Sequence, residues 1–147
     1  MKPTDDDWYE RERLHFAAAE GDLMEVQQLV SSGAPVGAFD DMRQTPLHYA
    51  AEREQYQVAA WLLEHGADVN AYDEKMIGET PLCLAVQTDY PELVELLLKH
   101  GANPDIRGWV GLTARVRAQR RADEKGRTIA ALIEQFCPAT PHPGSES

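Results

Sequence analysis

Cysteine is scarce in this chain of 147 residues, which has only Cys83 and Cys137. Two thiols are too few for the disulfide framework that holds many small secreted domains together, so a packed core must provide the stability. Long apolar runs are also missing, since stretches such as VAAWLL are far shorter than the roughly 20 residues that cross a bilayer. The N-terminal MKPTDDDWYERER has no apolar segment of the kind found in signal peptides. We therefore expect a cytoplasmic protein that does not enter a membrane.

Basic residues are few as well: 14 Lys and Arg stand against 25 Asp and Glu, which gives a formal net charge of −11. This balance argues against binding to nucleic acid or anionic membranes, and it favours a protein partner with a basic surface. The charge is uneven, because residues 1–105 hold 7 basic and 21 acidic residues, whereas residues 106–147 hold 7 and 4. We expect the basic side chains of the C-terminal part to solvate that end of the molecule: Arg115, Arg117, Arg120, Arg121, Lys125 and Arg127.

A repeat runs through most of the chain. Gly33, Gly66 and Gly101 each precede an alanine, and their spacings are 33 and 35 residues. The segment TPLHYA begins at Thr45 and TPLCLA begins at Thr80, while a third threonine stands at residue 113 in the same phase. The pattern predicts four units near residues 12–36, 45–70, 80–105 and 113–136. A unit of this size cannot bury its apolar face alone, so the units must stack.

The T-P-L-H-x-A opening and the G-A-D-V-N close of the second unit resemble the ankyrin repeat. The resemblance covers roughly residues 10–136 and implies an all-α solenoid of helix-turn-helix pairs with projecting β-turn fingers. The first and fourth units match the motif poorly, as expected of units that cap the two ends of a stack. We expect a single ankyrin-repeat domain over residues 1–137 and a disordered tail over residues 138–147.

Residues that favour helix ends fall at the expected places. Thr45 is a good N-cap and Pro46 suits a first helical position, where its missing N–H costs nothing. In the first unit we expect Asp6 or Asp7 to cap the first helix, and Asp22 with Glu25 to cap the second. Arg43 stands where the family usually has glycine, so it either takes an uncommon positive φ or the finger is remodelled. The inner register of the fourth unit is open, because arginines replace the Leu47 and Tyr49 of the second unit.

No catalytic or metal-binding motif is present, and the sequence predicts a non-enzyme without cofactor or metal. The resemblance implies that His15 and His48 make structural hydrogen bonds between units. Cys83 takes the same place in the third unit and is expected to be a small buried thiol. His65 and His100 each precede the glycine that ends a helix, which favours capping over metal binding.

Large apolar residues at three successive fingers are the least expected feature, since fingers are usually polar turns. The resemblance implies that fingers and the adjacent helix ends line a concave face that binds partners, and exposed aromatic residues anchor many protein interfaces. Acidic neighbours such as Asp40 and Asp73 would add a rim that attracts a basic partner. The predicted partner-binding residues are Phe39, Asp41, Met42, Glu52, Arg53, Tyr72, Glu74, Met76, Ile77, Glu79, Asp89, Trp109 and Val110. The alternative is that some of the apolar side chains pack beneath the neighbouring finger.

These features favour a non-catalytic protein-interaction module that binds a basic protein through its concave face and is a monomer on its own. A narrower alternative is an immunity protein or antitoxin-type inhibitor that covers a toxin enzyme, suggested by the strong acidity and the apolar fingers. A third possibility is a scaffold that self-associates through the thin fourth unit. The fold alone does not identify the partner, because one fold serves many unrelated functions.

Overall fold

Helices make up all the regular structure in the computed structural model, which describes residues 5–73, 75 and 78–139, with side chains from Glu12 onward. The described elements are α1 Asp5–Glu20, α2 Leu23–Ser31, α3 Pro46–Glu52, α4 Tyr56–Glu64, α5 Pro81–Ala85, α6 Pro91–Lys99, the 3₁₀-helix η1 Trp109–Gly111, α7 Ala114–Arg120 and α8 Glu124–Phe136.

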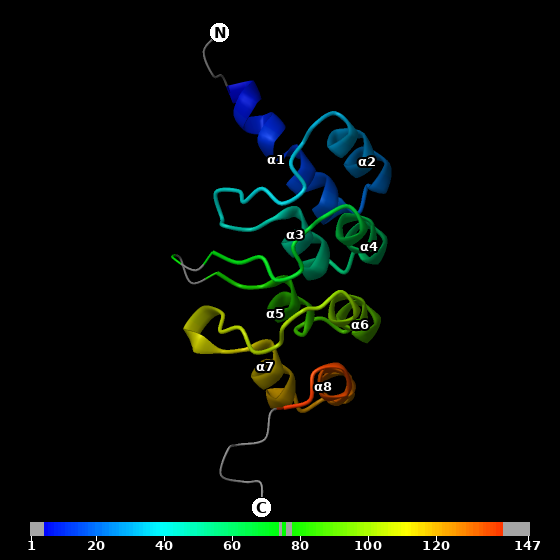
Figure 1. The fold of residues 1–147 in the computed structure, drawn as a ribbon, viewed down its shortest axis with the longest axis vertical. Coiled ribbons are helices and arrows are strands. Elements are labelled where there is room, and N and C mark those ends of the chain that lie inside the picture. Colours follow the sequence, from blue (N-terminus) through cyan, green and yellow to red (C-terminus); the bar gives the residue numbers. More distant parts are fainter. Residues whose placement is uncertain (1–4, 74, 76–77, 140–147) are drawn as a thin grey trace, which may run out of the picture.

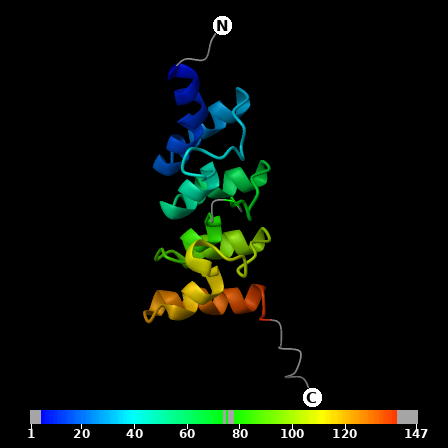
Figure 2. The ribbon, with the colours of Figure 1, turned by 90° about the vertical axis from the view of Figure 1, so that its left-hand side faces the viewer.

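The helices form four antiparallel pairs that stack along the long axis of the molecule (Figure 1). The odd-numbered helices form an inner column, in which α1 packs on α3, α3 on α5 and α5 on α7, while α2, α4, α6 and α8 form an outer column. The segments between successive pairs project to one side, which faces the viewer in Figure 2. This arrangement confirms the predicted all-α solenoid of helix pairs with projecting fingers.

Threonine sets the start of three inner helices. Thr80 and Thr113 accept hydrogen bonds from the backbone N–H groups of Cys83 (3.2 Å) and Val116 (3.1 Å), as N-caps do. The third, Thr45, is also the N-cap residue of its helix. The outer helices α4, α6 and α8 begin at residues 56, 91 and 124, in each case ten residues after the start of the inner helix at 46, 81 and 114. The fourth pair therefore keeps the register of the second and third, which answers the question left open by its sequence.

The apolar core is continuous from the first pair to the last. Leu14, Leu47 and Leu82 are buried in successive inner helices, and Leu97 and Ile133 are buried in outer helices. Truncation of such a leucine to alanine costs roughly 2–5 kcal/mol, because lost burial adds to the cavity left behind. Each pair therefore contributes to the burial of its neighbour, as a stacked repeat requires.

The histidines of the motif connect consecutive pairs, as the resemblance implied. His15 Nε2 lies 2.8 Å from the carbonyl oxygen of Ala38, beyond the first pair. His48 Nε2 reaches the carbonyl oxygen of Glu79, beyond the second pair. Cys83 is fully buried at the equivalent place, which confirms its structural role.

Three expectations, two about helix N-termini and one about the finger backbone, were tested by the structure. The cap pair of α2 is confirmed, because Asp22 Oδ1 accepts from the N–H of Glu25 at 3.1 Å. Arg43 has a φ of 61°, so the first of the two alternatives is correct. The predicted start of α1 was wrong: the helix begins at Asp5, one or two residues before the expected caps. Acidic residues are favourable within a first turn as well as at its cap, so the helix extends to the first of them.

Arg115 does not solvate the C-terminal end, which corrects the expectation from sequence. The residue is 8% exposed and occupies the place that Leu47 has in the second pair. Its guanidinium forms ion pairs with Asp105 (2.8 Å) and Glu134, and it donates to the carbonyl oxygen of Cys137 at 2.8 Å. The hydrogen bond from Arg115 holds the pKa of Asp105 below its ordinary value. Arg115 therefore joins α7 to the segment that precedes it and to the C-terminal end of α8.

Arg121 has a comparable role at the turns between inner and outer helices. It donates to the carbonyl oxygens of Val86 (2.9 Å) and Thr88 (2.6 Å), and it pairs with Asp89 (2.8 Å) and Asp123 (2.6 Å). The basic C-terminal part of the sequence thus serves largely to join the last pair to the third. Among the described residues, no helix is both long and apolar enough to cross a bilayer.

Candidate protein-binding face

The three fingers create the surface that we call the finger face. Finger 1 comprises residues 37–44, finger 2 residues 71–79 and finger 3 residues 104–112, and Figure 2 looks onto this side. Among the described residues, fingers 1 and 3 expose large apolar side chains: Phe39 (43%), Met42 (74%), Trp109 (64%) and Val110 (64%). Such side chains bury much area on binding, and proteins rarely expose them in groups without a function.

Finger 1 is organised by Asp40. One carboxylate oxygen accepts from the backbone N–H groups of Met42 (2.9 Å) and Gln44 (3.0 Å), and the other accepts from the Tyr49 hydroxyl. Burial and this hydrogen bond raise the pKa of Tyr49 above its ordinary value, so the hydroxyl remains a donor. Arg43, the residue after Met42, has a left-handed backbone conformation. Asp40 was expected in an acidic rim, but its carboxylate is used to fix the turn that carries Met42.

Finger 3 is fixed from the neighbouring finger by Glu79. One carboxylate oxygen of Glu79 accepts from the backbone N–H of Trp109 at 3.0 Å, and the other pairs with Arg117 at 2.8 Å. Arg117 also donates to the carbonyl oxygen of Trp109 at 3.2 Å. Gly108 makes room for this contact, since a Cβ there would lie 2.1 Å from the Glu79 Oε1 atom. The backbone of Trp109 is therefore held on both its N–H and its carbonyl side.

Glu79 is also held through its own backbone, by His48. The Nδ1 atom of His48 accepts from the Thr45 backbone N–H at 3.0 Å, which leaves Nε2 to carry the proton and donate to the Glu79 carbonyl. Burial lowers the pKa of His48 to about 4, so the ring is neutral near pH 7. A single residue at the base of finger 2 thus links the second pair to finger 3.

A groove of about 480 Å³ lies between the fingers. It is lined by Asp41, Met42, Arg43, Gln44, Gly78, Glu79 and Trp109. Four predicted partner-binding residues, Asp41, Met42, Glu79 and Trp109, therefore meet in one place. Arg43, Gln44 and Gly78 were missed, although the unusual arginine at position 43 had already marked this turn.

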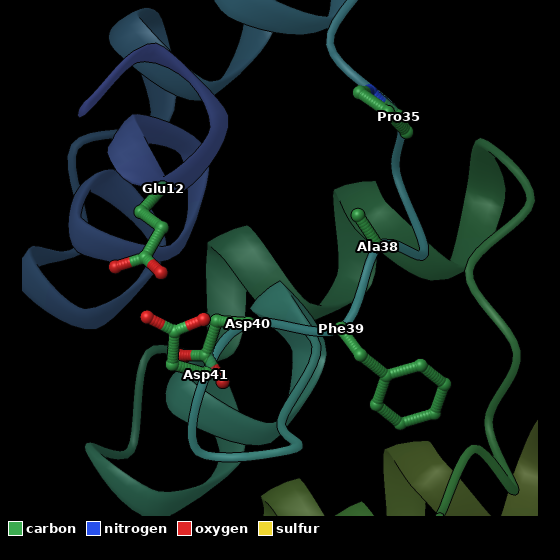
Figure 3. A pocket seen from close by; sticks show the side chains of 6 residues that line it. All are labelled: Glu12, Pro35, Ala38, Phe39, Asp40 and Asp41. Atoms are coloured by element: carbon green, nitrogen blue, oxygen red, sulfur yellow. The ribbon is translucent and has the colours of Figure 1, made fainter. Parts of the chain in front are cut away.

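A smaller pocket of about 100 Å³ lies between α1 and finger 1. It is lined by Glu12, Pro35, Ala38, Phe39, Asp40 and Asp41. Figure 3 shows the Glu12 carboxylate on α1 facing the side chains of Asp40 and Asp41, while the Phe39 ring points away from them. Phe39 and Asp41 were predicted to bind a partner, whereas Glu12 was missed because it comes from a different unit of the repeat.

The other predicted residues that the structure describes are not among those that line these two hollows. Glu52 is the last residue of α3, and Arg53 and Asp89 follow the C-terminal ends of α3 and α5, away from the ends where the fingers join. Tyr72 is half-buried, and Val110 is exposed in η1 with a φ of 53°. Glu74, Met76 and Ile77 lie outside the described residues, and their part in binding stays a prediction.

Chemistry other than binding finds no support in the described part of the chain. No group of three or more His, Cys, Asp and Glu side chains there could hold a metal ion. His65 and His100 are the C-cap residues of α4 and α6, and the Nδ1 atom of each lies 2.8 Å or 3.0 Å from the carbonyl oxygen one helical turn earlier. These contacts confirm the predicted capping positions of both histidines.

A stack of helix pairs with fixed, apolar fingers is the architecture of a repeat protein whose side surface binds other molecules. The comparison with known families agrees: a family model described as ankyrin repeats, in three copies, matches residues 14–108. The chain belongs to the ankyrin-repeat family. Ankyrin repeats are protein-interaction modules, and the family is typically non-catalytic.

Individual relatives come from distant organisms and are mostly much longer. The chain is 39% identical over 121 residues to an ankyrin repeat-containing protein of Treponema pallidum (strain Nichols), covering 82% of this chain and 39% of that protein. It is 33% identical over 108 residues to the E3 ubiquitin-protein ligase Ufd4 of Drosophila melanogaster, covering 74% of this chain and 4% of that protein. It is 38% identical over 86 residues to ankyrin repeat domain-containing protein 40 of Mus musculus, covering 58% of this chain and 23% of that protein. The chain thus spans less than half the length of each of these relatives.

Proposed function

We propose that this chain is a non-catalytic module that binds a protein with a basic surface through its finger face. The observation that carries the proposal is the grouping of Phe39, Met42, Trp109 and Val110 as exposed side chains on fingers 1 and 3. The backbone N–H groups of Met42 and Trp109 donate to the carboxylates of Asp40 and Glu79, which fixes these backbones before any partner arrives. Such preorganisation lowers the entropic cost of binding. The net charge of −11 supports a basic partner.

Affinity capture with matched variants tests this proposal. Met42→Ser with Trp109→Ser removes the apolar side chains of the groove, whereas Met24→Ser removes a similarly exposed methionine on α2, outside both hollows. The proposal predicts that wild type and Met24→Ser retain the same proteins from cell extract at physiological salt, and that the double variant loses them. Retention of the same proteins by the double variant would exclude the finger face as the binding surface.

Inhibition of a basic toxin enzyme is a narrower form of the same proposal, supported by the acidity of the chain. The candidate enzyme is the product of a neighbouring gene, purified separately. Equimolar chain should abolish its activity, and the Met42→Ser, Trp109→Ser variant should not. If the enzyme keeps full activity while the chain is bound to it, the proposed binding module stands and the inhibitor is excluded.

A further inference from the structure

The two hollows of the finger face are adjacent, because Asp41 lines both the groove and the smaller pocket. We infer that together they bind one extended segment of a partner protein in which a lysine or arginine lies next to an apolar residue. The cationic side chain enters the pocket beside Glu12, and the apolar side chain enters the groove beside Met42 and Trp109. This inference rests on the proposed function and specifies the partner's chemistry.

The pocket has two chemically different walls. Glu12, Asp40 and Asp41 supply carboxylates, while Pro35, Ala38 and Phe39 supply apolar surface. Lysine and arginine side chains match such a pair of walls, because their methylene stems cover apolar surface while the charged end meets an acid. A volume of about 100 Å³ suits one side chain and is small for a metabolite.

The groove suits an apolar side chain despite its charged lining. The guanidinium of Arg43 pairs with Asp73 of finger 2 at 3.3 Å, and Glu79 pairs with Arg117 at 2.8 Å. The charges of Arg43 and Glu79 are thus compensated within the chain, and Asp41 lies where the groove meets the pocket. Met42 and Trp109, which are 74% and 64% exposed, supply soft, polarisable surface for a hydrocarbon or aromatic side chain.

The distribution of charge sets the direction of the bound segment. Towards the C-terminal end, Arg117, Arg121 and Arg115 pair with Glu79, Asp89 and Asp105, each at 2.8 Å. The acidic lining of the pocket lies at the other end, between α1 and finger 1. The cation of the partner should therefore lie towards α1 and its apolar residue towards finger 3.

Selection from a random peptide library tests this inference with the full chain. Phage that display peptides of about 12 residues are selected on wild type, in parallel with the Met42→Ser, Trp109→Ser variant, at about 150 mM salt. The inference predicts that peptides enriched on wild type over the variant carry Lys or Arg within about two positions of Leu, Met, Phe or Trp. Enriched peptides without this pairing, or no enrichment over the variant, would overturn it.

A double-mutant cycle on one synthetic enriched peptide then locates each contact. Glu12→Gln with Asp41→Asn should weaken binding about tenfold, and it should have no further effect on a peptide whose cation is replaced by norleucine. Trp109→Ala should weaken binding at least about tenfold, and it should have no further effect on a peptide whose apolar residue is replaced by alanine. Independent effects in both cycles would overturn the assignment of the two hollows.

The controls separate this inference from the proposed function. Met24→Ser should bind the peptide as wild type does, and circular dichroism melting curves confirm that each variant is folded. If finger variants abolish binding but the cycles show no coupling, the two-hollow assignment fails and the proposed function stands. If all finger variants bind normally and Met24→Ser does not, the proposed function fails as well.

Discussion

The carboxylate of Glu79 accepts a hydrogen bond from the backbone N–H of Trp109 at 3.0 Å, across 30 residues of sequence. The same carboxylate pairs with Arg117, and the carbonyl of Glu79 accepts from His48. Glu79 therefore connects the second, third and fourth helix pairs at the point where Trp109, 64% exposed, is presented. Partner binding and the stability of the stack share this residue, which makes it a poor choice for separating the two.

Gly108 offers a sharper test of the Glu79–Trp109 contact. A methyl group in Gly108→Ala would overlap Glu79 Oε1 at 2.1 Å and force the carboxylate away. We expect a loss of about 1–3 kcal/mol in the free energy of unfolding, the usual cost of leaving such groups without their partners. Gly37→Ala is the control, because a Cβ at Gly37 meets nothing within 4 Å. Urea unfolding measures both, and equal stability of the two variants would refute the role assigned to Gly108.

Arg115 should matter for stability more than its neighbour Arg120, which is exposed. Arg115→Ala removes the contacts to Asp105, Glu134 and the Cys137 carbonyl and leaves a cavity in a buried position. We expect a loss of roughly 2–4 kcal/mol, against at most about 0.5 kcal/mol for Arg120→Ala. Denaturant titration followed by circular dichroism gives both values. A small effect at Arg115 would restore the view that these arginines only solvate the C-terminal end.

His48 should make stability depend on pH between its unfolded and folded pKa values. Burial lowers its pKa from the ordinary 6.5 to about 4, so the unfolded chain binds more protons in this window. The stability contributed by neutral His48 is complete above 6.5 and falls as the pH is lowered towards 4, by at most on the order of 3 kcal/mol. Asp105, whose pKa is lowered from 3.8, loses its contribution at lower pH.

The variant His48→Gln isolates this effect. The difference in unfolding free energy between wild type and His48→Gln should shrink when the pH is lowered from about 7.5 to about 5. Urea titrations at both pH values measure the difference. A difference that stays constant, or grows on acidification, would show that His48 is not buried in its neutral form.

Met42 and Trp109 should contribute little to stability, because their side chains are largely exposed. We expect Met42→Ser with Trp109→Ser to change the free energy of unfolding by no more than about 0.5–1 kcal/mol. Leu47→Ser, at a fully buried position, should unfold the chain or destabilise it severely. A large loss in the double variant, seen by thermal melting, would mean that the finger face is part of the core.

The repeat predicted the architecture well because each motif residue performs a local task. Thr45, Gly66 and Leu47 specify a helix start, a helix end and a buried contact wherever they recur, so their spacing gives the stack. The role of Arg115 was predicted wrongly. Arg115 replaces a core leucine, and its partners lie 10 and 19 residues away in sequence, where a motif gives no indication of them.

The candidate site was predicted only in part, for a similar reason. Exposed apolar residues on fingers were visible as departures from the motif, which is why Phe39, Met42 and Trp109 were found. Glu12 was missed because its relation to finger 1 depends on how α1 packs on α3. Glu79 was predicted to bind a partner as one of the acidic residues of the fingers. Its hydrogen bond with Trp109 was not predicted, because it depends on a contact between two fingers. Contacts between units depend on how the units pack in three dimensions, which the repeated sequence motif does not specify.

Site-specific photo-crosslinking tests the central claim, that the finger face is where a partner binds. Phe39 on finger 1 and Phe16 on α1 are both exposed, at 43% and 52%, and each is replaced in turn by p-benzoylphenylalanine. Only the first lines a hollow of the finger face. Irradiation of the complex with a captured partner should give a covalent product from position 39 and none from position 16. A product from position 16 alone would contradict the claim.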